Sequence, residues 1–231
     1  MSGARVGACR RCYDQSRRRV RMYQLHGREG WGSALIEAQL AWYGLPYRFE
    51  RVGDLLADAA AREALARLNP LAQVPTLVTA GGEVLAESLA ITLWLAETND
   101  SEDWVPLPRE RCRGRFLRWL TFCVSTLYPT FTYADIPARF VPMTEAQPGF
   151  LACIEDWRNR GWAMMENEAS GPWFLGERMS AIDLYIAVMS RWEPRRPWFA
   201  QHAPKLHAIA AAIDALPPLD AVMARNFPAK A

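Results

Sequence analysis

The sequence predicts an α/β domain followed by an all-helical domain. Two observations carry this prediction: short strand-like runs alternate with helical runs between residues 22 and 97, and only helical periodicity recurs after residue 108. The stretch between them, 98–108, holds several charged residues and two prolines. We therefore expect a first domain over 22–98 and a helical domain over 109–231, preceded by a disordered basic leader over 1–21.

The first domain is expected to have the element order β-α-β-α-β-β-α. Gly44 ends its first helix, Asn69-Pro70 ends its second, and Gly81-Gly82 forms the turn between its last two strands. The expected strands are 22–26, 47–52, 76–78 and 84–86, and the expected helices are 33–43, 59–68 and 88–97.

The second domain is expected to be built from helices over 111–128, 150–169, 181–190 and 204–216. Ser180 and Asp183 stand three residues apart before an apolar run, which is the spacing of a capping box. The helical pattern breaks at Pro129, so we expect an irregular chain after it.

The composition argues against membranes and nucleic acids as binding partners. Hydrophobic residues make up 51% of the chain, yet no apolar run approaches the roughly 20 residues that cross a bilayer. The formal net charge is +2, but residues 1–21 hold seven of the arginines and only one acid, so the rest of the chain is mildly acidic. We therefore expect neither membrane nor nucleic-acid binding.

The five cysteines predict no metal site. Cys112, Cys123 and Cys153 lie in helical patterns without metal-ligand spacing, and we expect buried thiols in a reducing compartment, the cytoplasm. Cys9 and Cys12 have the C-x-x-C form but precede the first strand, so we take this motif as incidental.

One stretch carries a family resemblance. The run "NPLAQVPTLVTAGGEVLAESLAI", residues 69–91, has a Val-Pro at 74–75 and an acid–hydroxyl pair at 87–88 that opens a helix. Both motifs in this order and at this spacing resemble the glutathione S-transferases of the bacterial, cytosolic type. The resemblance implies a thioredoxin-like domain before the helical domain, and it extends over nearly all of residues 22–227.

The resemblance also implies how glutathione would bind. In this family the proline is cis, which leaves the N–H and C=O of the preceding residue facing the cleft. Gln73, Val74 and Pro75 would meet the cysteinyl part of the tripeptide, while Glu87 and Ser88 would hold the charged γ-glutamyl end at a helix N-terminus. The alternative is an ordinary turn, a serine that only caps its helix and a solvated acid.

The catalytic position is less orthodox. Transfer requires the glutathione thiolate, and family members stabilise it with a hydroxyl or thiol near the end of the first strand or the start of the first helix. Here His26 stands about where a tyrosine is expected and Gly32 where a cysteine is expected. Ser33 is our candidate, although it could serve only as an N-cap.

His26 and Arg28 are two further candidates for the same site. His26 could be a supporting donor or simply a satisfied core group. Arg28 could supply positive potential near the sulfur or the glycyl carboxylate, or it could be solvated like most loop arginines.

An aromatic stretch in the helical domain predicts the second-substrate pocket. Its flat apolar side chains suit a flat apolar electrophile, although some of them must be ordinary core. The candidates are Trp119, Phe122, Tyr128, Phe131 and Tyr133, of which the last three are expected nearest the cleft.

The leading hypothesis is a glutathione transferase that adds the thiolate to a small apolar electrophile, with glutathione as co-substrate and no other cofactor. The alternatives are a non-catalytic glutathione-binding or scaffolding protein and a glutathione-dependent isomerase or reductase. The resemblance also implies a homodimer and a role in detoxification.

Overall fold

The computed structural model describes residues 22–228, so the expected leader lies outside the described residues. Its first domain is a four-stranded sheet in the order β2-β1-β3-β4, in which β1 and β2 are parallel and the other pairs antiparallel. The strands are β1 (Tyr23–Gly27), β2 (Tyr47–Arg51), β3 (Thr76–Val78) and β4 (Val84–Leu85). The helices are α1 (Ser33–Trp42), α2 (Ala59–Ala66) and α3 (Ser88–Thr98). The expected element order is confirmed.

The core of this domain lies between the sheet and two of its helices. Leu25 of β1 pairs in register with Leu77 of β3, and both are fully buried. They pack with Ile36 and Leu40 of α1 and with Ile91 of α3. Because strand side chains alternate between faces, His26 does not share the face of Leu25.

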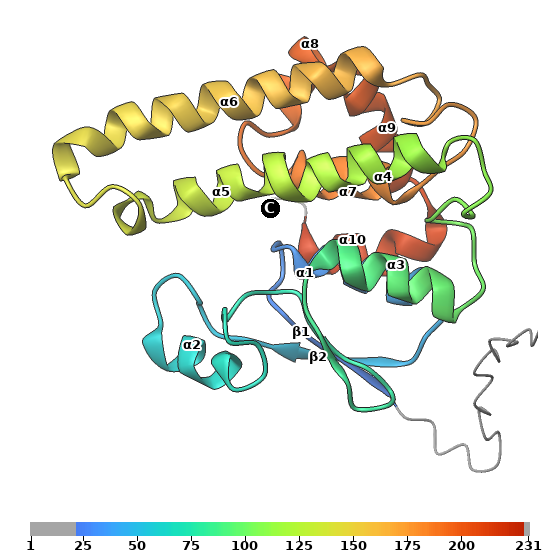
Figure 1. Ribbon diagram of the computed structural model, residues 1–231, viewed down its shortest axis with the longest axis horizontal. Coiled ribbons are helices and arrows are strands. Elements are labelled where there is room, and N and C mark those ends of the chain that lie inside the picture. Colours follow the sequence, from blue (N-terminus) through green and yellow to red (C-terminus); the bar gives the residue numbers. More distant parts are fainter. Residues whose placement is uncertain (1–21, 229–231) are drawn as a thin grey trace, which may run out of the picture.

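Among the described residues, the second part of the chain contains helices and no strand. Its helices are α4 (Arg113–Phe122), α5 (Tyr128–Asp135), α6 (Gln147–Glu168), α7 (Ala181–Met189), α8 (Arg196–His202), α9 (Pro204–Asp214) and α10 (Asp220–Asn226). Figure 1 shows α4 and α5 end to end alongside the long α6, with this pair of rows above the sheet domain. Every residue of α7 is buried, so α7 is the central helix of the domain.

The expectation of an irregular chain after Pro129 is wrong. The helix continues from α4 through a π-helical turn, Cys123–Leu127, directly into α5. Pro129 lies in the first turn of α5, where a missing N–H and a fixed φ are tolerated. Such π turns are frequent at functional sites.

The start of α7 has the expected capping box. Asp183 Oδ2 accepts hydrogen bonds from the Ser180 backbone N–H (2.7 Å) and the Ser180 hydroxyl (3.1 Å), and Oδ1 accepts one from the Phe174 N–H (2.7 Å). Burial raises the pKa of the Asp183 carboxyl to about 6, although these bonds oppose the shift.

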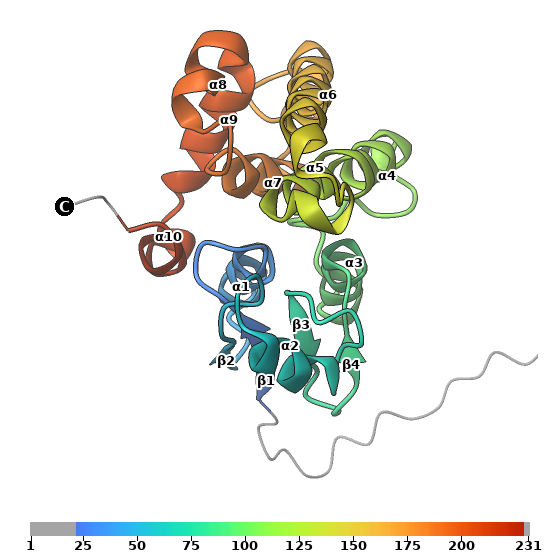
Figure 2. The ribbon, with the colours of Figure 1, turned by 90° about the vertical axis from the view of Figure 1, so that its left-hand side faces the viewer.

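The last helix ties the two domains together. Figure 2 shows α10 beside α1. The fully buried Glu37 of α1 forms an ion pair with Arg225 and accepts a hydrogen bond of 2.7 Å from Asn226 Nδ2. A buried carboxylate needs such partners, so this cluster fixes the helical domain against α1.

The structure also describes three of the five cysteines and the hydropathy of the helices. Cys123 is buried as expected, but Cys112 is only partly buried and Cys153 is exposed on α6; all three are free thiols. Within residues 22–228, no single helix has the length and hydropathy of a membrane span, and one bent pair, 204–214 with 217–226, meets both criteria only jointly.

Candidate functional site

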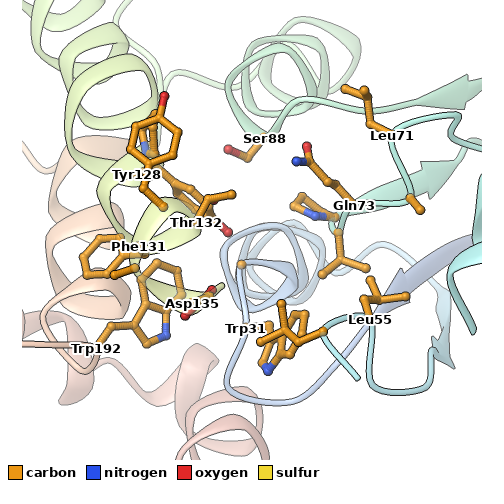
Figure 3. Close-up of a pocket in the computed structure, with 18 of the residues that line it drawn as sticks. Trp31, Leu55, Leu71, Gln73, Ser88, Tyr128, Phe131, Thr132, Asp135 and Trp192 are labelled. Atoms are coloured by element: carbon orange, nitrogen blue, oxygen red, sulfur yellow. The ribbon is translucent and has the colours of Figure 1, made fainter. Parts of the chain in front are cut away.

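A cleft of about 940 Å³ lies between the two domains. Figure 3 shows Gln73, Leu71, Leu55 and Trp31 on one side of it and α5 with Trp192 on the other. Its volume lies at the upper end of the roughly 300–1,000 Å³ usual for ligand clefts. Among the described residues, no group of His, Cys, Asp or Glu side chains could hold a metal ion there or elsewhere.

The loop before β3 forms one edge of the cleft. The Val74–Pro75 peptide bond is cis, and Gln73, Val74 and Pro75 all line the cleft. Asn69 also lines the cleft and holds this loop, because its Nδ2 donates to the Gln73 carbonyl oxygen and to Thr76 Oγ1, each at 3.1 Å. The Asn-Pro of the motif therefore has a structural role that supports the Val-Pro.

The corner between β4 and α3 continues this edge. Glu87 is exposed, with φ at +64°, a region that non-glycine residues seldom adopt. Ser88 is buried at the first position of α3, and the helix has no side-chain cap. The first-turn N–H groups of α3 are thus left for another acceptor. We call residues 73–75 with Glu87 and Ser88 the binding edge.

At the start of α1 the serine side chain does not line the cleft, unlike the serine at the start of α3. Gly32, not Ser33, is its N-cap residue, and this helix also lacks a side-chain cap. The Ser33 hydroxyl is fully buried, donates to the Arg28 carbonyl (2.9 Å) and accepts from the Arg28 N–H (3.1 Å). Ser33 therefore closes the loop 28–33, does not cap α1 and does not line the cleft.

His26 and Arg28 also lie outside the cleft lining. Burial lowers the pKa of His26, which pairs with Glu50 and Thr76 in the sheet and whose Nε2 has no hydrogen-bond partner among the described residues. Arg28 forms an ion pair with Asp54 at 3.2 Å and lies 5.3 Å over the Trp31 ring. The cation that does line the cleft on this side is Arg62, which sequence reasoning missed.

The loop before α1 is held by the helical domain. The Gly30 N–H donates to Asn226 Oδ1 at 3.2 Å, and the Gly30 carbonyl accepts from Trp192 Nε1 at 2.8 Å. Both partners lie more than 150 residues away along the chain, so no local pattern could have indicated them. The loop at the start of α1 is thereby fixed in place.

Aromatic side chains of the helical domain form the opposite wall. Tyr128, Phe131 and Trp192 meet edge to face, with ring centroids between 5.0 and 6.4 Å apart. Tyr133 lines the same cleft and is exposed. Burial raises the pKa of the Tyr128 phenol, and the carboxylates of Asp135 and Glu87 raise it further.

Two of the aromatic candidates lie elsewhere. Trp119 is 2% exposed and packs edge to face on Phe122 and Phe174 in the helical core, and neither Trp119 nor Phe122 lines the cleft. Because α4 packs on α7, its apolar side chains are used in the core, whereas those beyond the π turn reach the cleft.

The far end of the cleft is polar. Arg158 of α6 is 6% exposed and lies 5.2 Å over the Phe131 ring. Its Nε has no hydrogen-bond partner among the described residues, and burial lowers the pKa of its guanidinium. Asp135 and Glu193 line the cleft nearby, so the aromatic wall ends in a group of charges.

Comparisons with known proteins agree with this geometry. A model of the glutathione S-transferase N-terminal domain matches residues 36–98. The chain is 34% identical over 206 residues to the uncharacterized GST-like protein YncG of Escherichia coli K12, an alignment that covers 89% of this chain and 98% of that protein.

Solved structures of the same fold extend the comparison. A sphingomonad glutathione S-transferase complexed with glutathione is 25% identical with a TM-score of 0.71, over 89% of this chain and all of that one. A glutathione transferase homolog from Sulfitobacter with bound glutathione is 20% identical with a TM-score of 0.75, over 87% of this chain and 96% of that one. The chain belongs to the bacterial-type glutathione S-transferase family.

Proposed function

We propose that the protein is a glutathione transferase that joins the glutathione sulfur to a small, mainly apolar electrophile. The observation that carries the proposal is that the binding edge and the aromatic wall of α5 face each other across one cleft. A tripeptide on the edge would present its thiol toward the wall. The nucleophile and its acceptor would then share one enclosed space, which lowers the entropic cost of their encounter.

The binding edge supplies complementary groups along glutathione. The backbone of Val74 would pair with the cysteinyl unit, and the first-turn N–H groups of α3 with the Ser88 hydroxyl would take the γ-glutamyl carboxylate. Glu87 would hold the ammonium group. Arg62 is the cation suited to the glycyl carboxylate, because it lines the cleft and Arg28 does not.

The acceptor would lie against Phe131, Trp192 and Tyr133, where flat rings stack well. Its polar substituent would meet the guanidinium of Arg158 at the end of the wall. In the reaction, the thiol proton passes to solvent and the thiolate forms a C–S bond. With an aryl halide as acceptor, the halide ion then departs. With an activated alkene, solvent protonates the carbanion that the addition forms.

Turnover assays test the reaction type. We expect the purified protein to conjugate glutathione with an aryl halide and to turn over a mixed disulfide poorly, because no thiol of the described residues stands at the start of α1. Rapid disulfide reduction without conjugation would replace the proposal with a reductase. Glutathione binding without turnover of either substrate would indicate a binding or scaffolding protein.

A further inference from the structure

We propose that the phenol hydroxyl of Tyr128, from the helical domain, donates the hydrogen bond that stabilises the glutathione thiolate. This inference rests on the proposed function. It assigns the catalytic group that positions 26, 32 and 33 do not provide.

The strongest observation is the packing of Tyr128 on Gly32. A Cβ added at Gly32 would lie 2.0 Å from the Tyr128 hydroxyl oxygen, closer than any real contact. The hydroxyl thus occupies the place that a side chain at position 32 would take. Position 32 is where the family resemblance places a thiolate-stabilising side chain, and here the same space is filled from the other domain.

The phenol is available to a ligand. Tyr128 and Gly32 both line the cleft, together with Val74, Glu87 and Ser88 of the binding edge. Tyr128 is only partly buried, and its hydroxyl is not one of the fully buried polar atoms without a partner. The Ser33 hydroxyl, by contrast, already has two partners in its own loop.

The position of the phenol is fixed on both sides. Its ring meets Trp192 and Phe131 edge to face, at 5.4 and 6.4 Å between centroids. The same Trp192 donates to the Gly30 carbonyl, so one side chain aligns both the tyrosine and the loop that carries Gly32. A donor held in this way needs little reorganisation when charge develops on the sulfur.

The acid–base properties of the phenol suit a donor. Burial and two carboxylates keep Tyr128 protonated at neutral pH. It therefore offers an O–H to the thiolate and does not itself compete as an anion. The thiol proton leaves to solvent, and Tyr128 neither gains nor loses a proton in the cycle.

The test is a titration of glutathione bound to the protein, followed by the ultraviolet absorbance of its thiolate. Tyr128→Phe keeps the ring and its contacts with Phe131 and Trp192 but removes the hydroxyl. We expect it to raise the pKa of the bound thiol by about one to two units and to lower the conjugation rate at neutral pH about tenfold to a hundredfold. The rate defect should shrink at higher pH, and glutathione affinity should change little.

Two variants serve as matched controls. Tyr133→Phe removes another phenol hydroxyl from the same helix and cleft, and Ser33→Ala removes the hydroxyl at the start of α1. We expect neither to move the titration of the bound thiol. A shift in Ser33→Ala with none in Tyr128→Phe would overturn the inference.

The outcomes also separate this inference from the proposed function. A wild-type protein that binds glutathione with a lowered thiol pKa, and keeps that pKa in Tyr128→Phe, overturns the role of Tyr128 alone. A wild-type protein that binds no glutathione, or leaves its thiol pKa at the free value, overturns both proposals.

Discussion

The starts of α1 and α3, at the cleft, differ in side-chain capping from the start of α7, in the core of the helical domain. In α7 a capping box closes the helix start, where Asp183 accepts hydrogen bonds from the Ser180 N–H, the Ser180 hydroxyl and the Phe174 N–H. In α1 and α3 no side chain caps the helix, and both starts border the cleft. In α1 the Ala34 and Leu35 N–H groups donate to the Trp31 and Gly32 carbonyls, so α3 is the start at the cleft whose first N–H groups are left for another acceptor.

The largest expected effect is at the capped start. Asp183→Ala should lower the free energy of unfolding by about 2–4 kcal/mol, because it leaves the Phe174 and Ser180 N–H groups buried without an acceptor. Chemical denaturation measures this loss. The matched control is Asp58→Ala at the exposed start of α2, where the side chain caps Ala60 and Ala61 and the loss should be about 1 kcal/mol. Equal losses at both positions would contradict the comparison.

The effect of Asp183→Ala should depend on pH. The pKa of Asp183 is raised to about 6 in the folded protein from an ordinary value near 3.8, so the folded state binds more protons between these values. The contribution of Asp183 to stability is therefore greatest below about pH 4 and falls as pH rises to about 6, by up to about 3 kcal/mol. Unfolding of wild type and variant should differ more at about pH 4 than at about pH 7; the reverse order would contradict the raised pKa.

A smaller effect is expected at the uncapped start of α1. Gly32→Ala forces the Tyr128 hydroxyl to move, which should cost about 1–3 kcal/mol of stability and raise the pKa of the bound thiol. Thermal unfolding and the thiolate titration measure the two effects. Gly114→Ala in α4 is the control, because nothing lies within 4 Å of the added Cβ, and it should be neutral or stabilising by up to about 1 kcal/mol. A neutral Gly32→Ala would show that the contact with Tyr128 is loose.

The two sides of the cleft also differed in how far the sequence predicted them. The binding edge is local: residues 69–88 carry its turns, its proline and its helix start within one stretch, and the structure brings Gln73, Val74, Pro75, Glu87 and Ser88 to the cleft. The opposite wall depends on contacts between distant residues. Nothing near Tyr128 in the sequence indicates that its hydroxyl lies against Gly32.

Other differences between the expectations and the structure have local causes. A proline at position 129 suggested a break, but a proline in the first turn of a helix is compatible with that helix. Ser33 looked available because its partner, the Arg28 backbone, belongs to an irregular loop that has no sequence signature. Trp119 and Tyr128 lie in one aromatic stretch, yet the π turn between them separates core from cleft.

The most direct test of the account is a calorimetric titration with glutathione of the wild type and two double variants. Glu87→Ala with Ser88→Ala removes the acid–hydroxyl pair at the start of α3, and Glu97→Ala with Thr98→Ala removes a like pair at the end of the same helix, outside the cleft. We predict that the first variant loses at least about a hundredfold in affinity, since each bond to a charged group contributes about 1.5–3 kcal/mol, while the second binds like the wild type. Wild-type affinity in Glu87→Ala with Ser88→Ala would contradict the account.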